Sequence, residues 1–108
     1  MEAGQQLSMH VAEQDGVWTL VLAGELDMAT APEFRERLLD LFADGAREVV
    51  IDLGELAYMD SVGLGVLVAG LKRYREAGGD LHLRHPRDQV SQVLDLTGVA
   101  QLFQNQPG

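Results

Sequence analysis

The stretch VVIDL, residues 49–53, decides the fold. A short run of β-branched and aliphatic residues is typical of a strand in a parallel sheet, and we expect this strand to be covered on both faces. The segment from Val62 to Leu71 follows without a single charge and ends in basic residues and Gly78-Gly79, as a helix C-terminus does. A second short strand is expected at Leu81–Arg84. The region therefore predicts a right-handed strand–helix–strand unit with parallel strands.

The N-terminal region predicts an antiparallel hairpin. Strands are expected at Leu7–Ala12 and Val17–Ala23, and the connection between them ends in the turn-forming pair Asp15-Gly16. Because the hairpin is antiparallel and the strand–helix–strand unit is parallel, the two together predict a mixed sheet.

A loop and a capped helix are expected after the hairpin. Residues 24–29 have the composition of a loop, and Thr30-Ala31-Pro32-Glu33 predicts a capping box, in which the Thr30 side chain accepts a hydrogen bond from the Glu33 amide. Pro32 suits the first helical turn, where no backbone donor is needed. One face of this helix is apolar, with Phe34, Leu38, Leu41 and Phe42.

The C-terminal region predicts one more helix, at Asp88–Leu96, which ends before Gly98. We expect the tail from Gln101 to be weakly ordered. The predicted order is β-β-α-β-α-β-α, an α/β fold, and 108 residues suffice for a single domain, 1–108, with its core at about 7–103.

Composition limits the classes of function. Eight basic residues against 17 acidic ones give a net charge of −9, which disfavours direct nucleic-acid binding because phosphates are repelled. The chain lacks cysteine, and no segment reaches the roughly 18 apolar residues that a membrane span needs. The polar residues 1–6 show no signal peptide, so we expect a cytoplasmic protein without a membrane association.

Ser61 is the most informative polar residue because it stands where the uncharged helix begins. A hydroxyl at this position can cap the helix, which is worth about 1 kcal/mol, or it can accept a phosphate beside the positive end of the helix dipole. A phosphate would add about −1.5 to −2 charges next to Asp60. Local chemistry alone leaves both interpretations open.

Three glycines in the same helix, Gly63, Gly65 and Gly70, also need a reason. Each costs roughly 1 kcal/mol relative to alanine inside a helix, so some backbone or side chain should approach closely. Packing within the domain accounts for Gly70. For the first turn, with its exposed apolar residues, we expect a patch where a partner docks.

Other chemistries find little support in the sequence. The nucleophile elbow of hydrolases needs a glycine two residues before the serine, where this chain has Met59, and no spacing ties His10, His82 or His85 to Ser61. The glycines around Leu64 lack the Lys-Ser/Thr pair of a phosphate-binding loop, and the histidines lack metal-ligand spacing. Asp52 ends a strand, as in aspartyl-phosphate receivers, but no lysine follows Leu83. We therefore expect a protein that is not an enzyme and that needs no cofactor or metal.

Several motifs together resemble a known family. The chain is similar to the STAS-domain anti-sigma factor antagonists of bacteria from about Leu7 to Phe103. The matching motifs are Gly24-Glu25-Leu26-Asp27, Thr30-Ala31, Val50-Ile51-Asp52-Leu53, Met59-Asp60-Ser61-x-Gly63-Leu64-Gly65 and Gly78-Gly79.

The resemblance implies the STAS fold and a partner-switching role. In such proteins the unphosphorylated form binds an anti-sigma factor, usually also a serine kinase, and thereby frees the sigma factor. The kinase then phosphorylates the serine that matches Ser61, and a phosphatase resets it. The implied partner-binding residues are Asp27, Met28, Thr30, Asp60, Ser61, Val62, Gly63, Leu64 and Gly65.

The chain departs from the family pattern at two places. Val62 replaces a second small polar residue, which leaves Ser61 as the acceptor. The tail after Phe103 is too short for the usual last helix, which should be missing or abbreviated.

Two alternative functions are left open. A scaffold STAS module, in a sensory assembly or beside a transporter, would use Ser61 only as a cap. An independent nucleotide hydrolase would need turnover by the chain alone. Self-association is left open.

Overall fold

The computed structural model describes residues 6–104, which contain a four-stranded sheet in the order β1-β2-β3-β4. The pair β1 (Leu7–Gln14) and β2 (Val17–Leu26) is the predicted antiparallel hairpin. Its turn is formed by Asp15 and Gly16, which both have positive φ, 54° and 84°. The strands β3 (Glu48–Met59) and β4 (Asp80–Arg84) pair in parallel, and β3 also pairs in parallel with β2. The mixed sheet is confirmed.

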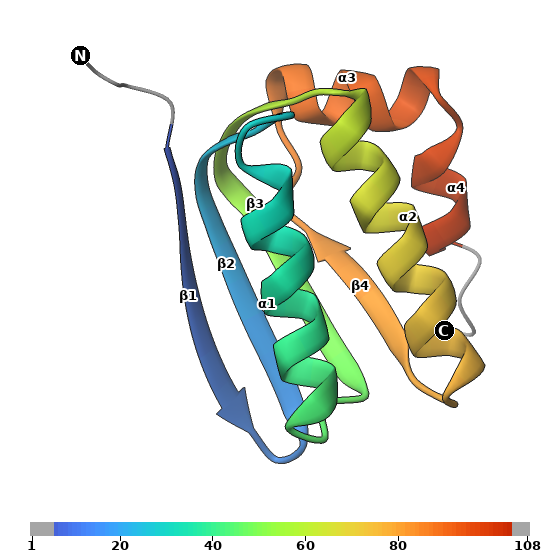
Figure 1. The fold of residues 1–108 in the computed structure, drawn as a ribbon. Helices are drawn as coiled ribbons and strands as arrows, with labels where there is room; N and C mark the ends of the chain where they lie inside the picture. Colours follow the sequence, from blue (N-terminus) through green and yellow to red (C-terminus); the bar gives the residue numbers. More distant parts are fainter. Residues whose placement is uncertain (1–5, 105–108) are drawn as a thin grey trace.

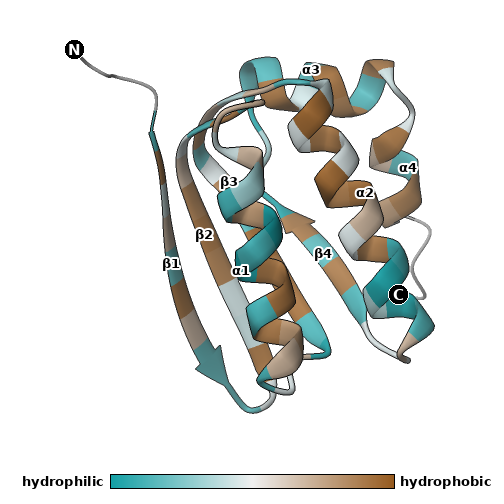
Figure 2. Ribbon diagram, in the orientation of Figure 1, coloured by the Kyte–Doolittle hydropathy of each residue, from teal (hydrophilic) through white to brown (hydrophobic). Residues whose placement is uncertain are grey.

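Four helices complete the fold of the described residues. α1 (Ala31–Ala43) and α2 (Ser61–Glu76) lie side by side against the sheet and run in the same direction (Figure 1). α3 (Asp88–Leu96) has the predicted bounds, and α4 (Val99–Gln104) follows it. The apolar sides of α1 and α2 supply much of the core, as the hydrophobic colours along both helices indicate (Figure 2).

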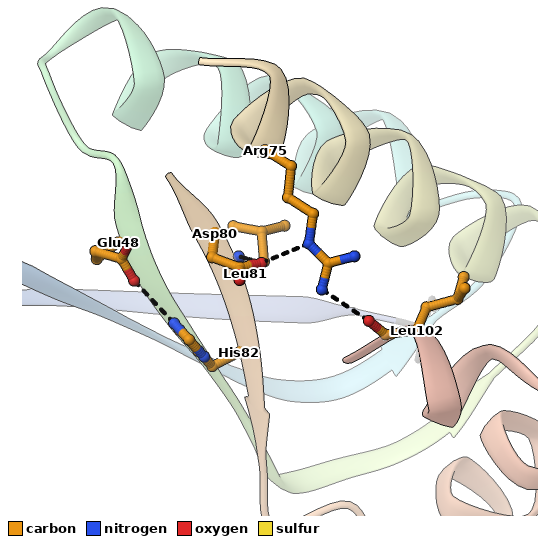
Figure 3. A network of polar contacts seen from close by, with 6 residues as sticks. All are labelled: Glu48, Arg75, Asp80, Leu81, His82 and Leu102. Carbon is orange, nitrogen blue, oxygen red and sulfur yellow. Dashed lines mark hydrogen bonds and ion pairs between the residues drawn. The ribbon is translucent and has the colours of Figure 1, made fainter. Parts of the chain in front are cut away.

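The short helix α4, of six residues, corrects the expectation of a weakly ordered tail and agrees with a last helix that is abbreviated. Val99 and Phe103 are buried at 9% and 7% exposure, so the tail is held by apolar contacts. Arg75 near the end of α2 donates to the Leu102 carbonyl at 2.7 Å and pairs with Asp80 at 2.9 Å (Figure 3). These contacts tie α4 to α2 and to the start of β4. Residues 105–108 lie outside the described part of the chain.

The strands β2 and β3 extend further than predicted. Gly24–Leu26 was expected in a loop and the central strand was expected to end at Leu53, yet the parallel pairing continues as far as Leu26 and Met59. The pairing shifts register between Val21 and Ala23 and again between Gly24 and Glu25, which breaks the regular alternation that predicts a strand. Gly24, with φ of 107°, cannot be replaced because a Cβ there would collide with the Gln6 carbonyl.

Only one face of the sheet is fully covered, which corrects the expectation for β3. Val49, Ile51 and Leu53 are completely buried under the helices, whereas Val50 and Asp52, which point the other way, are only partly buried. His82 of β4 partly covers that second face and bonds Glu48 at 2.9 Å (Figure 3). The aliphatic run therefore occurs because β3 lies between β2 and β4 in the sheet, and it does not indicate helices on both faces.

Tyr74 links the two helices and should give the fold a pH dependence. Its hydroxyl donates to the Leu38 carbonyl at 2.7 Å in the interior, and burial raises the pKa of Tyr74 to about 12, against a smaller opposing effect of Arg47. Ionisation is therefore easier in the unfolded chain, so the contribution of Tyr74 to stability should be constant below about pH 10 and should be lost as the pH rises towards 12. Urea unfolding across this range should show the decline, and Tyr74→Phe should remove most of it while costing about 1 kcal/mol at pH 7. A parallel decline in Tyr74→Phe would contradict this assignment.

Candidate functional site

The candidate site lies where the carboxyl ends of two parallel strands meet. Leu26, the last residue of β2, pairs with Met59, the last residue of β3, and the Asp60 amide donates to the Leu26 carbonyl at 3.1 Å. The loop after β2 and the start of α2 are therefore brought side by side (Figure 1). Crevices at such strand ends are common ligand and partner sites in α/β proteins.

Asp60, and not Ser61, caps α2. Its Oδ1 accepts from the amides of Val62 at 3.0 Å and Gly63 at 2.9 Å, while its own backbone is extended. Its Oδ2 accepts from the Met28 amide at 2.9 Å, across from the β2–α1 loop. One carboxylate thus fixes both the first turn of the helix and the neighbouring loop. The interpretation of Ser61 as the cap is wrong.

Ser61 is the first residue of α2 and is exposed to solvent. Within residues 6–104, no group forms a hydrogen bond with its hydroxyl, since the nearby amides of Val62 and Gly63 already bond Asp60. An exposed hydroxyl on a rigid first turn, without an internal partner, can react with an incoming transferase without loss of a structural bond.

The loop of residues 27–30 is held by its own side chains. Asp27 Oδ1 accepts from the amides of Ala29 at 2.9 Å and Thr30 at 3.1 Å, and Thr30 Oγ1 accepts from the Asp27 amide at 3.0 Å. The Thr30 hydroxyl also donates to the Glu25 carbonyl at 2.8 Å. The Thr30 side chain therefore bonds the residues that precede it and does not cap α1, so the predicted capping box is wrong.

The predicted partner-binding residues separate into an exposed and a buried group. Met28 is 72% exposed and Val62 is 44% exposed, and Ser61 and Gly65 also reach the surface, with the carboxylates of Asp27 and Asp60 half-buried between them. The interior holds the other three predicted residues, Thr30, Gly63 and Leu64. Because they are buried, these three shape the site from inside the domain.

Two residues of the site were missed by the sequence analysis. Tyr58, near the end of β3, is a 41% exposed aromatic residue three positions before Ser61. Gln89 of α3 forms two bonds with the Met59 backbone, accepting from its amide at 2.8 Å and donating to its carbonyl at 2.9 Å. No local pattern could reveal Gln89, because it acts across 30 residues of chain.

Glycine occurs at three positions of α2 for different reasons. A Cβ at Gly63 would lie 2.6 Å from Leu26 Cγ, and one at Gly70 would lie 2.9 Å from Leu38 Cδ1. Gly63, for which a partner was expected, is therefore required by packing within the domain, since the Leu26 carbonyl would also lie 3.0 Å from its Cβ. At Gly70 the close atoms are the ends of flexible leucine side chains, so this glycine is tightly packed but not strictly required. A Cβ at Gly65 would meet nothing within 4 Å, so the fold itself does not need this glycine.

The structure does not support the alternatives of a serine hydrolase or an aspartyl-phosphate receiver. His82 bonds Glu48, and His85 lies 3.5 Å from Asp52, so neither is a base for Ser61. Burial alone would raise the pKa of Asp52, but the Gly54 amide, His85 and Arg84 together bring that pKa below its ordinary value. Asp52 is thus an engaged structural carboxylate, unlike the free aspartate of a receiver.

Residues 6–104 lack two further kinds of feature. No cluster of three or more histidine and acidic side chains is placed to hold a metal ion there. In the same range, none of the helices combines the length and the apolar character that crossing a membrane requires.

Comparisons with known proteins agree on one family. The sequence model of the STAS domain family matches residues 8–107. An anti-sigma-B factor antagonist of Staphylococcus aureus is 32% identical over 97 residues, which cover 90% of each chain. The crystal structure of an anti-sigma factor antagonist from Mycobacterium paratuberculosis superposes with a TM-score of 0.84 at 28% identity, covering 95% of this chain and 87% of the other. SpoIIAA of Bacillus in its phosphorylated form shares the fold, with a TM-score of 0.70 at 20% identity over 87% and 86% of the two chains.

Proposed function

The chain belongs to the STAS domain family, and from that premise we propose that it is an anti-sigma factor antagonist switched by phosphorylation of Ser61. In this proposal the unphosphorylated protein binds an anti-sigma factor that is also a serine kinase, and the sigma factor is released. Phosphate on Ser61 ends that binding, and a phosphatase restores it. The cytoplasm, where bacterial transcription takes place, is the expected location.

The observation that carries the proposal is the exposed Ser61 hydroxyl, which has no internal hydrogen-bond partner in residues 6–104. Asp60 bonds both the first turn of α2 and the Met28 amide, and Met28 and Val62 expose apolar side chains at these two places. A kinase therefore finds an accessible acceptor within a surface that a protein partner can cover.

The phosphate would remain on the outside of the domain. Asp60 already occupies the amides of Val62 and Gly63, so a phosphate on Ser61 cannot take them without displacing a carboxylate. Its charge of about −1.5 to −2 would add to that of Asp60. Modification is thus expected to change the charge of the docking surface and to leave the fold intact.

The experiment is incubation with ATP and the anti-sigma factor that a Ser61→Ala bait retains from lysate, followed by intact-mass measurement. The unmodified chain should gain the mass of one phosphate group, and Ser61→Ala should gain none. Ser8→Ala, which removes an exposed hydroxyl on β1, is the matched control and should be phosphorylated like the parent. Phosphate uptake by Ser61→Ala, or none by the parent, would favour the scaffold role, in which Ser61 takes no phosphate.

A further inference from the structure

A groove of about 400 Å³ runs along the surface between α1 and α2. Leu38 and Leu39 of α1 form one wall, and Val66 and Ala69 of α2 form the other. The groove begins beside Val62, the residue after Ser61, so it continues the candidate site along the helices. Figure 2 shows that hydrophobic residues dominate α2 along this stretch.

Gly65 keeps the groove open in its first half. A glycine weakens a helix relative to alanine, and at Gly63 and Gly70 the fold compensates through close contacts with Leu26 and Leu38. Gly65 has no such contact, because nothing lies within 4 Å of the place where its Cβ would be. The missing side chain therefore leaves room for a group from outside the domain.

Two arginines line the groove, one from each helix. Arg35 lies on α1 one turn before Leu38, and Arg73 lies on α2 beside Tyr74, whose hydroxyl bonds the Leu38 carbonyl. The α2 part of the lining extends from Val62 to Arg73, about 16 Å by the helical rise. Among residues 6–104, neither arginine has an ion pair or a hydrogen bond, and Arg73 lies over the Phe42 ring, 5.8 Å from its centroid. In a chain of net charge −9, two unpaired cations along an apolar groove are complementary to an acidic partner.

We propose that this groove receives an amphipathic helix of the anti-sigma factor, with an apolar side chain against Gly65 and carboxylates at Arg35 and Arg73. The inference rests on the proposed function and specifies which chemistry the partner brings. A helix suits a groove about three turns long between two parallel helices, and apolar anchors at helical spacing are the usual way in which such grooves bind.

The test is calorimetric titration of the chain with the purified anti-sigma factor that the Ser61→Ala bait retains. Gly65→Leu fills the groove, and Arg35→Glu and Arg73→Glu reverse the charges that line it; each should weaken binding at least about tenfold. Arg37→Glu changes the same charge on an exposed position of α1 outside the groove and should stay within about threefold of the parent. Gly65→Ala should raise the melting temperature without strengthening binding, which separates folding from docking.

The outcomes for the groove and for Ser61 are distinguishable. If Gly65→Leu and Arg35→Glu bind like the parent while Ser61→Asp is weakened, the groove proposal is overturned and the proposed function stands. If the groove variants weaken binding while Ser61→Asp and Ser61→Ala bind alike, the groove is supported and phosphate gating falls. If the bait retains no anti-sigma factor, both are overturned. If replacing one carboxylate of the partner by lysine restores binding to Arg35→Glu, the residue that contacts Arg35 is identified directly.

Discussion

Phosphorylated protein should bind the anti-sigma factor at least about a hundredfold more weakly than Ser61→Ala. At an effective dielectric constant of about 20, two unit charges roughly 8 Å apart repel each other by about 2 kcal/mol. Nearly two phosphate charges facing one acidic group of the partner therefore cost several kcal/mol, and about 1.4 kcal/mol corresponds to a factor of ten in affinity. Ser61→Asp, which adds a single charge, should have an intermediate affinity, roughly thirtyfold weaker than that of Ser61→Ala.

Calorimetry with each form at two salt concentrations measures this effect. Ser8→Asp adds the same charge on β1, away from α2, and should leave the affinity nearly unchanged. Higher salt should reduce the difference between Ser61→Asp and Ser61→Ala, because exposed charges are screened. Equal affinities for those two variants at low salt would refute a switch that works through local charge.

Hydrophobic periodicity and terminal signals were enough to predict α1, α2 and α3. The bounds of α3 were predicted correctly, and the apolar positions of α1 proved to be its buried side. The ends of β2 and β3 were missed because they depend on pairing between distant segments across register shifts, which leave no alternating pattern in the chain. The short α4 was missed for a similar reason, since Arg75 and the burial of Phe103 hold it from outside.

The location of the site could be predicted, but its internal organisation could not. Asp60 and Ser61 are adjacent and are both good capping residues, so only the direction of the Asp60 carboxylate shows which one caps α2. Likewise, Gly63 and Gly65 look alike in the sequence, and only the positions of neighbouring atoms show that one is needed for packing and the other is free. Both distinctions favour Ser61 and Gly65 as the residues left for a partner.

Asp60→Ala should destabilise the domain by about 2–3 kcal/mol, the largest loss expected from a single change at this site. The substitution removes three hydrogen bonds to the amides of Met28, Val62 and Gly63, of which the helix cap alone is worth about 1 kcal/mol. The Met28 bond spans 32 residues, so its loss also frees the β2–α1 loop from α2. Asp60→Asn keeps one acceptor oxygen and should show a smaller loss.

Urea denaturation of Asp60→Ala, followed by circular dichroism, gives this free energy. Asp95→Ala removes the same charge from an exposed position of α3 whose side chain forms no bond within residues 6–104, and it should change stability by less than about 0.5 kcal/mol. Binding should also weaken in Asp60→Ala, even at temperatures where it is fully folded, because Met28 and Ser61 lose their common support. Stability equal to that of Asp95→Ala would show that the carboxylate is not what joins the loop to the helix, and the rigid presentation of Ser61 would then need another cause.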